Sequence, residues 1–202
     1  MRARDKAELT VTEQARRAQI VRAAIDTIAE TDYARASFSA IARTAGLSST
    51  GMISYHFAGK QDLMAEVMRT ILAEFTDFVL ARGDDGTAAG RLAAFIVANC
   101  EFMRDHRNHL VTLLRIRAAA SDAAASGKQA DSDRAKMAEL LAVGQRAGEF
   151  REFDTDLMAG FILSLRNGVI LRLASEPEFD LTTCTAELLT TIQLATGTAP
   201  TQ

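Results

Sequence analysis

The sequence predicts an all-α protein with an N-terminal three-helix helix-turn-helix head and a C-terminal helical bundle as its body. Three observations support this. Of the 202 residues, 48% are apolar and two are proline, so helix breakers are rare. Valine, isoleucine and threonine never alternate with polar residues as they do in half-buried strands. One N-terminal stretch also carries the pattern of two helices joined by a glycine turn.

The first helix of the head is expected to start after Thr10 and to end near Glu30. Thr10 and Glu13 have the spacing of a capping box, in which each residue satisfies a free backbone N–H of the helix start. The residues before Thr10 are charged and unpatterned, which predicts a mobile arm. The inner face of the helix is expected to consist of Ile20, Ala23, Ala24, Thr27 and Ile28.

Residues 37–60, SFSAIARTAGLSSTGMISYHFAGK, predict the helix-turn-helix. Ser37 is suited to cap a helix whose apolar residues recur at i, i+3, i+4 and i+7. Gly46 stands where a helix end needs a left-handed residue. Ser48 or Ser49 is then expected to cap a second helix over residues 49–57. Helix-turn-helix shapes also occur as plain packing units in helical proteins, so the motif alone leaves both readings open.

The second helix is expected to bury Ile53 and Phe57 and to keep its other residues available for DNA. Hydroxyl groups bond bases or phosphates, Gly51 lets the helix approach the groove, and Met52 suits a thymine methyl group. The polar residues at its far end suit phosphate oxygens. The predicted DNA-binding residues are Ser37, Ser39, Ser48, Ser49, Thr50, Gly51, Met52, Ser54, Tyr55, His56 and Lys60.

With these residues in view, the N-terminal third of the chain resembles the TetR family of bacterial transcriptional regulators. The resemblance implies a DNA-binding head of residues 1–60 and an effector-binding and dimerisation domain of residues 61–202. It also implies a two-fold dimer formed by a four-helix bundle of the last two helices. The residues that carry the resemblance are Ser37, Ile41, Ala42, Ala45, Gly46, Leu47, Ser48, Tyr55, His56, Phe57, Lys60 and Leu63.

The chain departs from the family pattern in one interval. From Gly46 to Phe57 it is one residue longer than usual, and Ser54 stands where the family commonly has a phosphate-binding tyrosine. Because of this apparent insertion, the family pattern leaves the DNA contacts assigned to residues 48–54 open by one position.

The body is expected to consist of long helices separated by clear breaks. A helix over residues 60–82 ends before Gly83, and the segment DAAASGKQADSD, residues 122–133, is expected to be a loop. The other helices are expected over residues 87–105, 107–120, 132–147, 154–175 and 181–196.

The last two helices offer more apolar surface than one small body covers, which predicts a homodimer. The other reading is that these faces complete the core of the monomer. Arg166, Asn167 and Arg172 interrupt the most apolar run, Leu157–Leu173, so we expect no membrane span.

Charge and cysteine content agree with a cytoplasmic DNA-binding protein. Residues 1–62 carry nine basic and seven acidic side chains, whereas residues 63–202 carry fourteen and nineteen, so the head is the more positive part. Cys100 and Cys184 belong to no paired motif, and no secretory signal is apparent. We expect no enzyme, cofactor or metal: nucleotide, zinc and nucleophile motifs are absent. His106 and His109 are better explained by an exposed helix start than by a metal.

A regulator that responds to a ligand needs a cavity lined by large or polar residues of the body. Arg166 suits an anionic effector, although a salt bridge within the chain or across the dimer is the blander and favoured account. The predicted lining residues are Phe95, Asn99, Phe102, Met103, Leu113, Met137, Leu141, Phe161, Leu165, Arg166 and Asn167.

The sequence therefore predicts a repressor that a small molecule releases from a double-stranded DNA operator. One alternative is a helical small-molecule carrier or enzyme with a vestigial helix-turn-helix, which would not bind duplex DNA. The other is a DNA-binding protein without an effector, whose body would be filled. The sequence names neither the operator nor the effector, because hydroxyl and glycine contacts discriminate poorly between bases.

Overall fold

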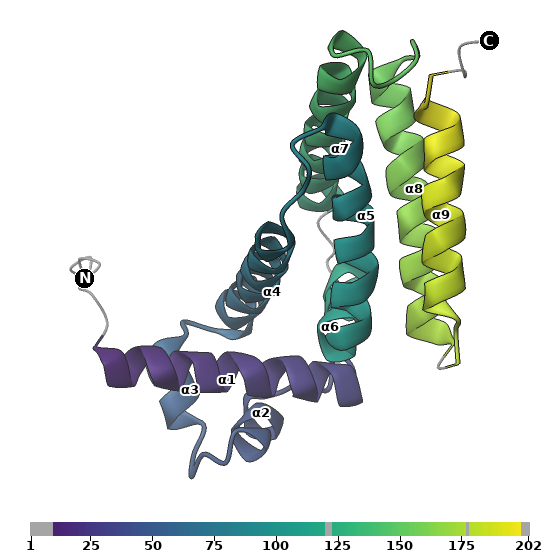
Figure 1. The fold of residues 1–202 in the computed structure, drawn as a ribbon. Helices are drawn as coiled ribbons and strands as arrows, with labels where there is room; N and C mark the ends of the chain where they lie inside the picture. Colours follow the sequence, from purple (N-terminus) through teal and green to yellow (C-terminus); the bar gives the residue numbers. More distant parts are fainter. Residues whose placement is uncertain (1–9, 120–122, 177, 199–202) are drawn as a thin grey trace. The chain divides into compact units, whose positions relative to one another are not determined.

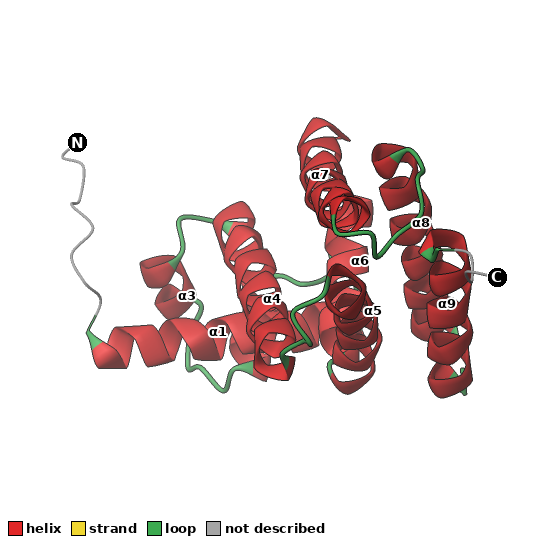
Figure 2. Cartoon of the chain, turned by 45° about the horizontal axis from the view of Figure 1, so that its top comes forward, coloured by secondary structure: helices red, strands yellow, loops and turns green. Residues whose placement is uncertain are grey.

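The computed structural model describes residues 10–119, 123–176 and 178–198, and side chains at all of these except 123–130. The predicted N-terminal arm lies outside the described residues. Within them the helices are joined by turns and loops, and the one β feature is an isolated bridge between Phe150 and Gly197 (Figure 2), which confirms the all-α prediction. The helices are α1 (Val11–Glu30), α2 (Phe38–Thr44), α3 (Gly51–His56), α4 (Lys60–Arg82), α5 (Ala88–Asp105), α6 (Arg107–Ala119), α7 (Ala123–Arg146), α8 (Thr155–Ser175) and α9 (Leu181–Thr196).

The chain forms two compact units. The first consists of Met1–Leu72 and Val111–Ala119, and the second of Ala73–Leu110 and Ala120–Gln202. Helices α4 and α6 therefore contribute residues to both units. The compact first unit extends to Leu72 and includes part of α6, so it does not coincide with the division at residue 60. That division, which separates the proposed DNA-binding and effector-binding functions, stays a prediction.

The first unit is built around α1, which packs against α2 (Figure 1). The capping box predicted for Thr10 and Glu13 is present, and the residues of the predicted inner face are buried. Ile20, Ile41, Ile53 and Leu63 are fully buried and come from all four helices of the unit's first segment. The core of this unit thus depends on isoleucine and leucine side chains that α1, α2, α3 and α4 each supply.

The turn between α2 and α3 is set by Gly46, whose φ is +64°. The N–H of Gly46 donates to the carbonyl of Arg43, and the N–H of Leu47 donates to the carbonyl of Ala42. This pair of bonds is a Schellman motif, which satisfies carbonyls that a helix end leaves free. Ser37 caps α2 as predicted, since its hydroxyl accepts from the N–H of Ala40.

The cap predicted for the second helix of the helix-turn-helix, which is α3, was wrong. Thr50, not Ser48 or Ser49, precedes α3, and its side chain makes no capping hydrogen bond. The backbone of Thr50 is already helical, with φ −69° and ψ −17°, so the chain enters α3 through a tight turn. The carbonyl of Thr50 accepts from the N–H groups of both Ile53 and Ser54. A side-chain cap needs an extended residue at this position.

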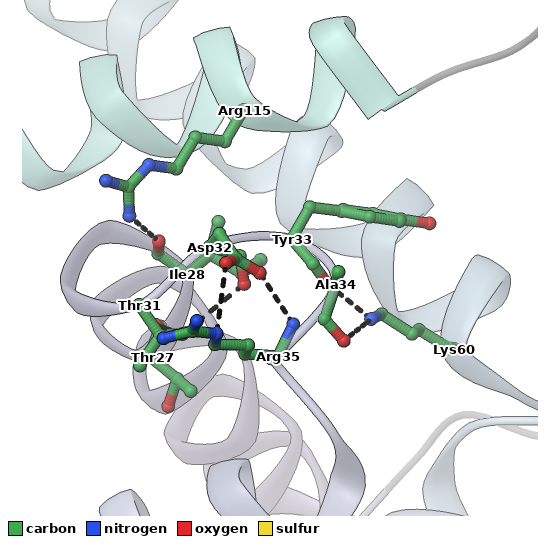
Figure 3. Close-up of polar contacts among 9 residues, drawn as sticks. All are labelled: Thr27, Ile28, Thr31, Asp32, Tyr33, Ala34, Arg35, Lys60 and Arg115. Carbon is green, nitrogen blue, oxygen red and sulfur yellow. Dashed lines mark hydrogen bonds and ion pairs between the residues drawn. The ribbon is translucent and has the colours of Figure 1, made fainter.

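The C-terminal end of α1 is held by side chains from α6. The hydroxyl of Thr112 donates to the carbonyl of Ile25 at 2.9 Å. The guanidinium of Arg115 donates to the carbonyl of Ile28 at 2.6 Å (Figure 3). A cation at a helix C-terminus is also favoured by the helix dipole. These contacts explain why residues 111–119 belong to the first unit.

In the second unit, α5 packs against α7, α8 and α9, and α8 packs against both α7 and α9. Helices α8 and α9 lie side by side (Figures 1 and 2). Asp154 and Asp180 cap the starts of α8 and α9 through their carboxylates. The predicted boundaries of both helices are confirmed because these caps are readable in the sequence.

The loop predicted for residues 122–133 was wrong, because α7 begins at Ala123 and continues to Arg146. Serine, aspartate and glycine favoured a loop in the sequence. The same segment contains four alanines, at residues 123–125 and 130, and alanine has the highest helix propensity of all residues. Packing of α7 against α8 adds a tertiary contribution that local composition does not reveal.

Candidate nucleic-acid interface and effector site

Helix α3 has one buried side and one exposed side. Ile53 and Phe57 are buried as predicted. Met52 and Tyr55 are exposed, and the hydroxyl-bearing Ser54 also faces solvent. An exposed helix side with small, polar and thioether groups has the size and chemistry of a major-groove reader.

The other predicted DNA-binding residues lie around α3 in the same unit. Residues 37, 39, 48, 49 and 51 are exposed, and Thr50 and His56 are half-buried. The hydroxyl of Ser37 is already used in the cap of α2, so it offers DNA only its remaining hydrogen-bonding capacity. The role of each residue in DNA binding stays a prediction.

Tyr55, exposed over 62% of its surface, donates its hydroxyl to a carboxylate oxygen of Glu13 at 3.2 Å. Hydrogen bonds from the backbone and hydroxyl of Thr10 lower the pKa of Glu13. The carboxylate therefore carries a negative charge at neutral pH beside a residue predicted to meet phosphate. Sequence reasoning missed this contact, because the two residues are 42 positions apart.

His56 and Lys60 are less free than their exposure in a short polar motif suggests. Burial and then repulsion from Arg17 lower the pKa of His56, with a smaller opposing effect of Glu13. The ammonium of Lys60 donates to the carbonyl of Tyr33 at 2.5 Å and lies 4.4 Å from the centre of the Tyr33 ring (Figure 3). Burial also lowers the pKa of Lys60. Lys60 thus ties α4 to the segment between α1 and α2.

The second unit contains an aromatic cluster formed by α4, α5 and the start of α6. Phe102 is central, because its ring lies 5.4 Å from those of Phe75 and Phe78 and 4.4 Å from that of His106. His109 completes the cluster and bonds a carboxylate oxygen of Glu74 at 2.9 Å. Both histidines are half-buried, so the expectation that they mark an exposed helix start was wrong. In the described part of the chain, no group of three or more potential ligands suits a metal.

The structure places the predicted effector residues in different surroundings. Six of them are buried, namely Asn99, Phe102, Met103, Leu113, Met137 and Leu141. Leu113 belongs to the first compact unit, whereas the others belong to the second. Phe161, Leu165 and Asn167 lie on the exposed side of α8. As lining residues of a cavity, these three side chains were expected to point inward, and this expectation was wrong. The buried side of α8 includes Ile162 and Val169 instead.

Arg166 of α8 is half-buried, so its exposure is intermediate between that of the buried and the exposed lining candidates. It donates to the side-chain oxygen of Asn167 at 2.8 Å, and its guanidinium carbon lies 5.7 Å from the centre of the Phe95 ring. The amide of Asn99 donates to the carbonyl of Phe95 within α5. Arg166 therefore lies close to the aromatic side chains of α5, and its role toward an effector stays a prediction.

Two family models match the chain in succession. Residues 20–67 match the model described as bacterial regulatory proteins of the tetR family. Residues 85–171 match the model described as the tetracyclin repressor-like C-terminal domain. The chain belongs to the TetR family. The first match covers the helix-turn-helix, and the second covers most of the second unit.

Named relatives of this TetR-family chain agree with the assignment. Over 87 residues it is 40% identical to the HTH-type transcriptional regulator BetI of Klebsiella pneumoniae, a match that covers 42% of this chain and 44% of that protein. Among solved structures, a putative transcriptional regulator from Saccharomonospora viridis in complex with choline has a TM-score of 0.80 at 21% identity, covering 92% of this chain and 100% of that one. The SmeT–triclosan complex has a TM-score of 0.75 at 22% identity, covering 93% and 94%.

Proposed function

We propose that this TetR-family protein is a homodimeric transcriptional repressor of the bacterial cytoplasm that binds duplex DNA through α3 and releases it when a small molecule binds. The exposed side of α3 carries the DNA-binding part of the proposal. Its core residues Ile53 and Phe57 are buried, and Met52, Ser54 and Tyr55 are left at the surface. The matching family models and the names of the relatives support the same function.

On DNA, the residues of the interface divide into two kinds of contact. We assign Met52 and Ser54 to base edges, because both are exposed near the middle of α3. We assign Ser37, Tyr55 and Lys60 to phosphates, because hydroxyl and ammonium groups suit phosphate oxygens. Such contacts fix the register of the protein on the duplex.

The dimer is proposed to form through the exposed apolar side of α8 and α9. Phe161 and Leu194 are 61% and 80% exposed, and Leu157, Leu165 and Leu171 continue the surface. Positions 157, 161, 165, 168 and 171 recur at helical spacing along one side of α8. Neither Gly160 nor Gly168 has a neighbour near the place of a β-carbon, so a partner helix can approach closely.

By length and composition alone, α8 also meets the requirements for a membrane-spanning helix among the described residues. A dimer explains the same apolar surface, because an exposed patch of this kind marks an interaction site. Two-fold symmetry would place the two α3 helices in half-sites one DNA turn, about 34 Å, apart.

The effector is proposed to bind in the second unit, next to the aromatic cluster around Phe102. Helices α4 and α6 contribute residues to both units, so a change in their second-unit parts can bias the first. A ligand that prefers the DNA-incompetent state lowers DNA affinity by the same factor by which DNA lowers ligand affinity. The choline and triclosan complexes of structural relatives support ligand binding by proteins of this fold.

The DNA-binding part is tested by titrating the protein into a duplex from the region upstream of its own gene at several KCl concentrations. We expect the logarithm of the association constant to fall linearly with the logarithm of salt concentration, because phosphate contacts release counterions. A carrier or enzyme with a vestigial motif would show no such binding.

The effector part is tested by a thermal-shift screen that begins with choline and triclosan. A molecule that raises the unfolding midpoint binds the folded state, and it is then titrated against the protein–DNA complex. Unchanged DNA affinity under saturating ligand would contradict release by an effector and would favour an effector-independent DNA-binding protein.

A further inference from the structure

Arg17 of α1 lies at the junction of α1, α3 and α4. One terminal nitrogen of its guanidinium donates to the backbone carbonyl of His56 at 2.6 Å, and the other lies 2.5 Å from a carboxylate oxygen of Glu66. The guanidinium carbon also lies 4.3 Å from the centre of the Phe57 ring. Three different interactions therefore hold one side chain in place.

The contact with His56 acts on the end of the recognition helix, because His56 is the last residue of α3. The last carbonyls of a helix have no partner within it. A cation at this end also interacts favourably with the negative end of the helix dipole. Helix α3 has six residues, far fewer than an isolated helix needs for stability. The orientation of α3 must therefore come from its contacts with the rest of the unit. Arg17 supplies the charged contact among them.

Glu66 anchors Arg17 to α4. Its second carboxylate oxygen lies 2.8 Å from a guanidinium nitrogen of Arg69, so Glu66 forms ion pairs with both Arg17 and Arg69. Burial raises the pKa of Glu66, but hydrogen bonds from Arg69 and Arg17 together lower it below its ordinary value. The ion pair is thus intact at neutral pH. Arg17 connects a fixed point on α4 to the carbonyl end of α3.

We propose that Arg17 is a positioning residue, which sets the orientation of the recognition helix through the His56 carbonyl without itself contacting DNA. The side chain of Arg17 is only 24% exposed, and its two terminal nitrogens are engaged within the protein. This inference rests on the proposed function, because an orientation matters only if α3 enters a groove. Neither Arg17 nor Glu66 was a predicted site residue.

The experiment compares Arg17→Ala, Arg17→Lys and Arg69→Ala with the wild type, using the duplex from upstream of the gene at several KCl concentrations. Arg69 is the matched control, because it binds the same carboxylate, is 64% exposed and has no bond to α3 among the described contacts. We expect Arg17→Ala to lose roughly tenfold in affinity with an unchanged salt slope, because no phosphate contact is removed. Lysine should restore part of the loss, and Arg69→Ala should bind as the wild type does.

Hydrogen exchange of the free proteins provides a readout that does not depend on DNA. In Arg17→Ala, amides of residues 51–57 should exchange faster while those of α8 remain unchanged, since only the end of α3 is released. If Arg17→Ala is unfolded at the assay temperature, the same comparison is made with Arg17→Lys.

Three results would overturn the inference. One is wild-type DNA affinity in a folded Arg17→Ala protein. Another is a salt slope that falls by about one, which would identify Arg17 as a direct phosphate contact. The third is an equal loss of DNA affinity in Arg69→Ala, which would show that the loss comes from removing a positive charge near Glu66 and not from the contact with His56. If the wild type itself fails to bind duplex DNA, the proposed function fails instead.

Discussion

At the scale of single residues, the behaviour of the α3 surface depends on which side chains already have partners. Tyr55 is paired with Glu13, Lys60 with the carbonyl of Tyr33, and the His56 carbonyl with Arg17. Each pair joins residues 27 to 42 positions apart in the sequence. The free protein thus holds its predicted phosphate-contacting groups in defined places, and one of these places includes a carboxylate.

Glu13→Gln is predicted to increase DNA affinity. Glutamine keeps the hydrogen-bonding pattern of the capping box but removes the negative charge beside Tyr55. Because the charge lies within one Debye length of the proposed phosphate contacts, we expect a gain of about twofold to threefold at low salt that shrinks as salt is added. Fluorescence anisotropy with labelled duplex measures this gain. Glu30→Gln, at the opposite end of α1, is the control, and an equal gain there would point to net charge alone.

The pH dependence of stability is predicted to include a contribution from His56. The folded-state pKa of His56 is lower than its ordinary value, so the unfolded chain binds the proton more readily. Stability is therefore lost as the pH falls below about 6.5, the unfolded value, and is unaffected well above it. The thermal midpoint of the wild type should therefore fall more than that of His56→Gln as the pH is lowered. Parallel curves would refute the contribution.

At the scale of elements, the sequence predicts helices best where a cap marks their ends. Thr10, Asp154 and Asp180 are such caps, and α1, α8 and α9 begin beside them. The errors lie where local composition competes with tertiary packing. The first turns of α7 read as a loop, and the start of α3 uses a helical Thr50 in place of a serine cap.

The same limit applies to the candidate site. The buried residues of α3 follow from their i, i+4 spacing, so they were predictable. Arg17 and Glu13 were not, since nothing in the sequence relates α1 to α3 across about 40 positions without the fold. The exposed orientation of Phe161 was missed because α8 is apolar on several sides, which leaves no single inner stripe to identify.

Gly46→Ala is predicted to destabilise the first unit by roughly 1–2 kcal/mol, because a β-carbon disfavours the left-handed backbone of this turn. No atom lies near the place of that β-carbon, so the cost is conformational rather than steric. Gly59→Ala is the matched control, since Gly59 is equally unobstructed and has no left-handed φ. Urea unfolding followed by circular dichroism compares the two. Equal stability of both variants would show that the turn is not held in this conformation.

At the scale of the whole molecule, the proposed function needs two copies of the chain. The exposed apolar side of α8 and α9 is the feature of the single chain that most needs an explanation, because such a surface in water is unfavourable. A homodimer removes it from solvent and gives the DNA-binding heads the two-fold symmetry that paired half-sites require.

Phe161→Glu is predicted to convert the dimer to a monomer, because it would bury two unpaired carboxylates in an apolar interface. Light scattering coupled to size exclusion measures the mass directly. Lys136→Glu, on the exposed surface of α7, should remain dimeric. A wild-type protein that is monomeric at micromolar concentration would contradict the proposed interface, as would a dimeric Phe161→Glu variant.

The most direct test of the central claim, that a dimer inserts two copies of α3 into successive major grooves, is a guanine N7 methylation-protection footprint on the upstream duplex. Guanine N7 lies on the floor of the major groove. A dimer of this kind is expected to give two protected patches whose centres lie one helical turn, ~34 Å, apart on one face of the duplex. That arrangement would be contradicted by the absence of N7 protection, or by a single unpaired patch, in a sample in which the duplex is saturated with protein.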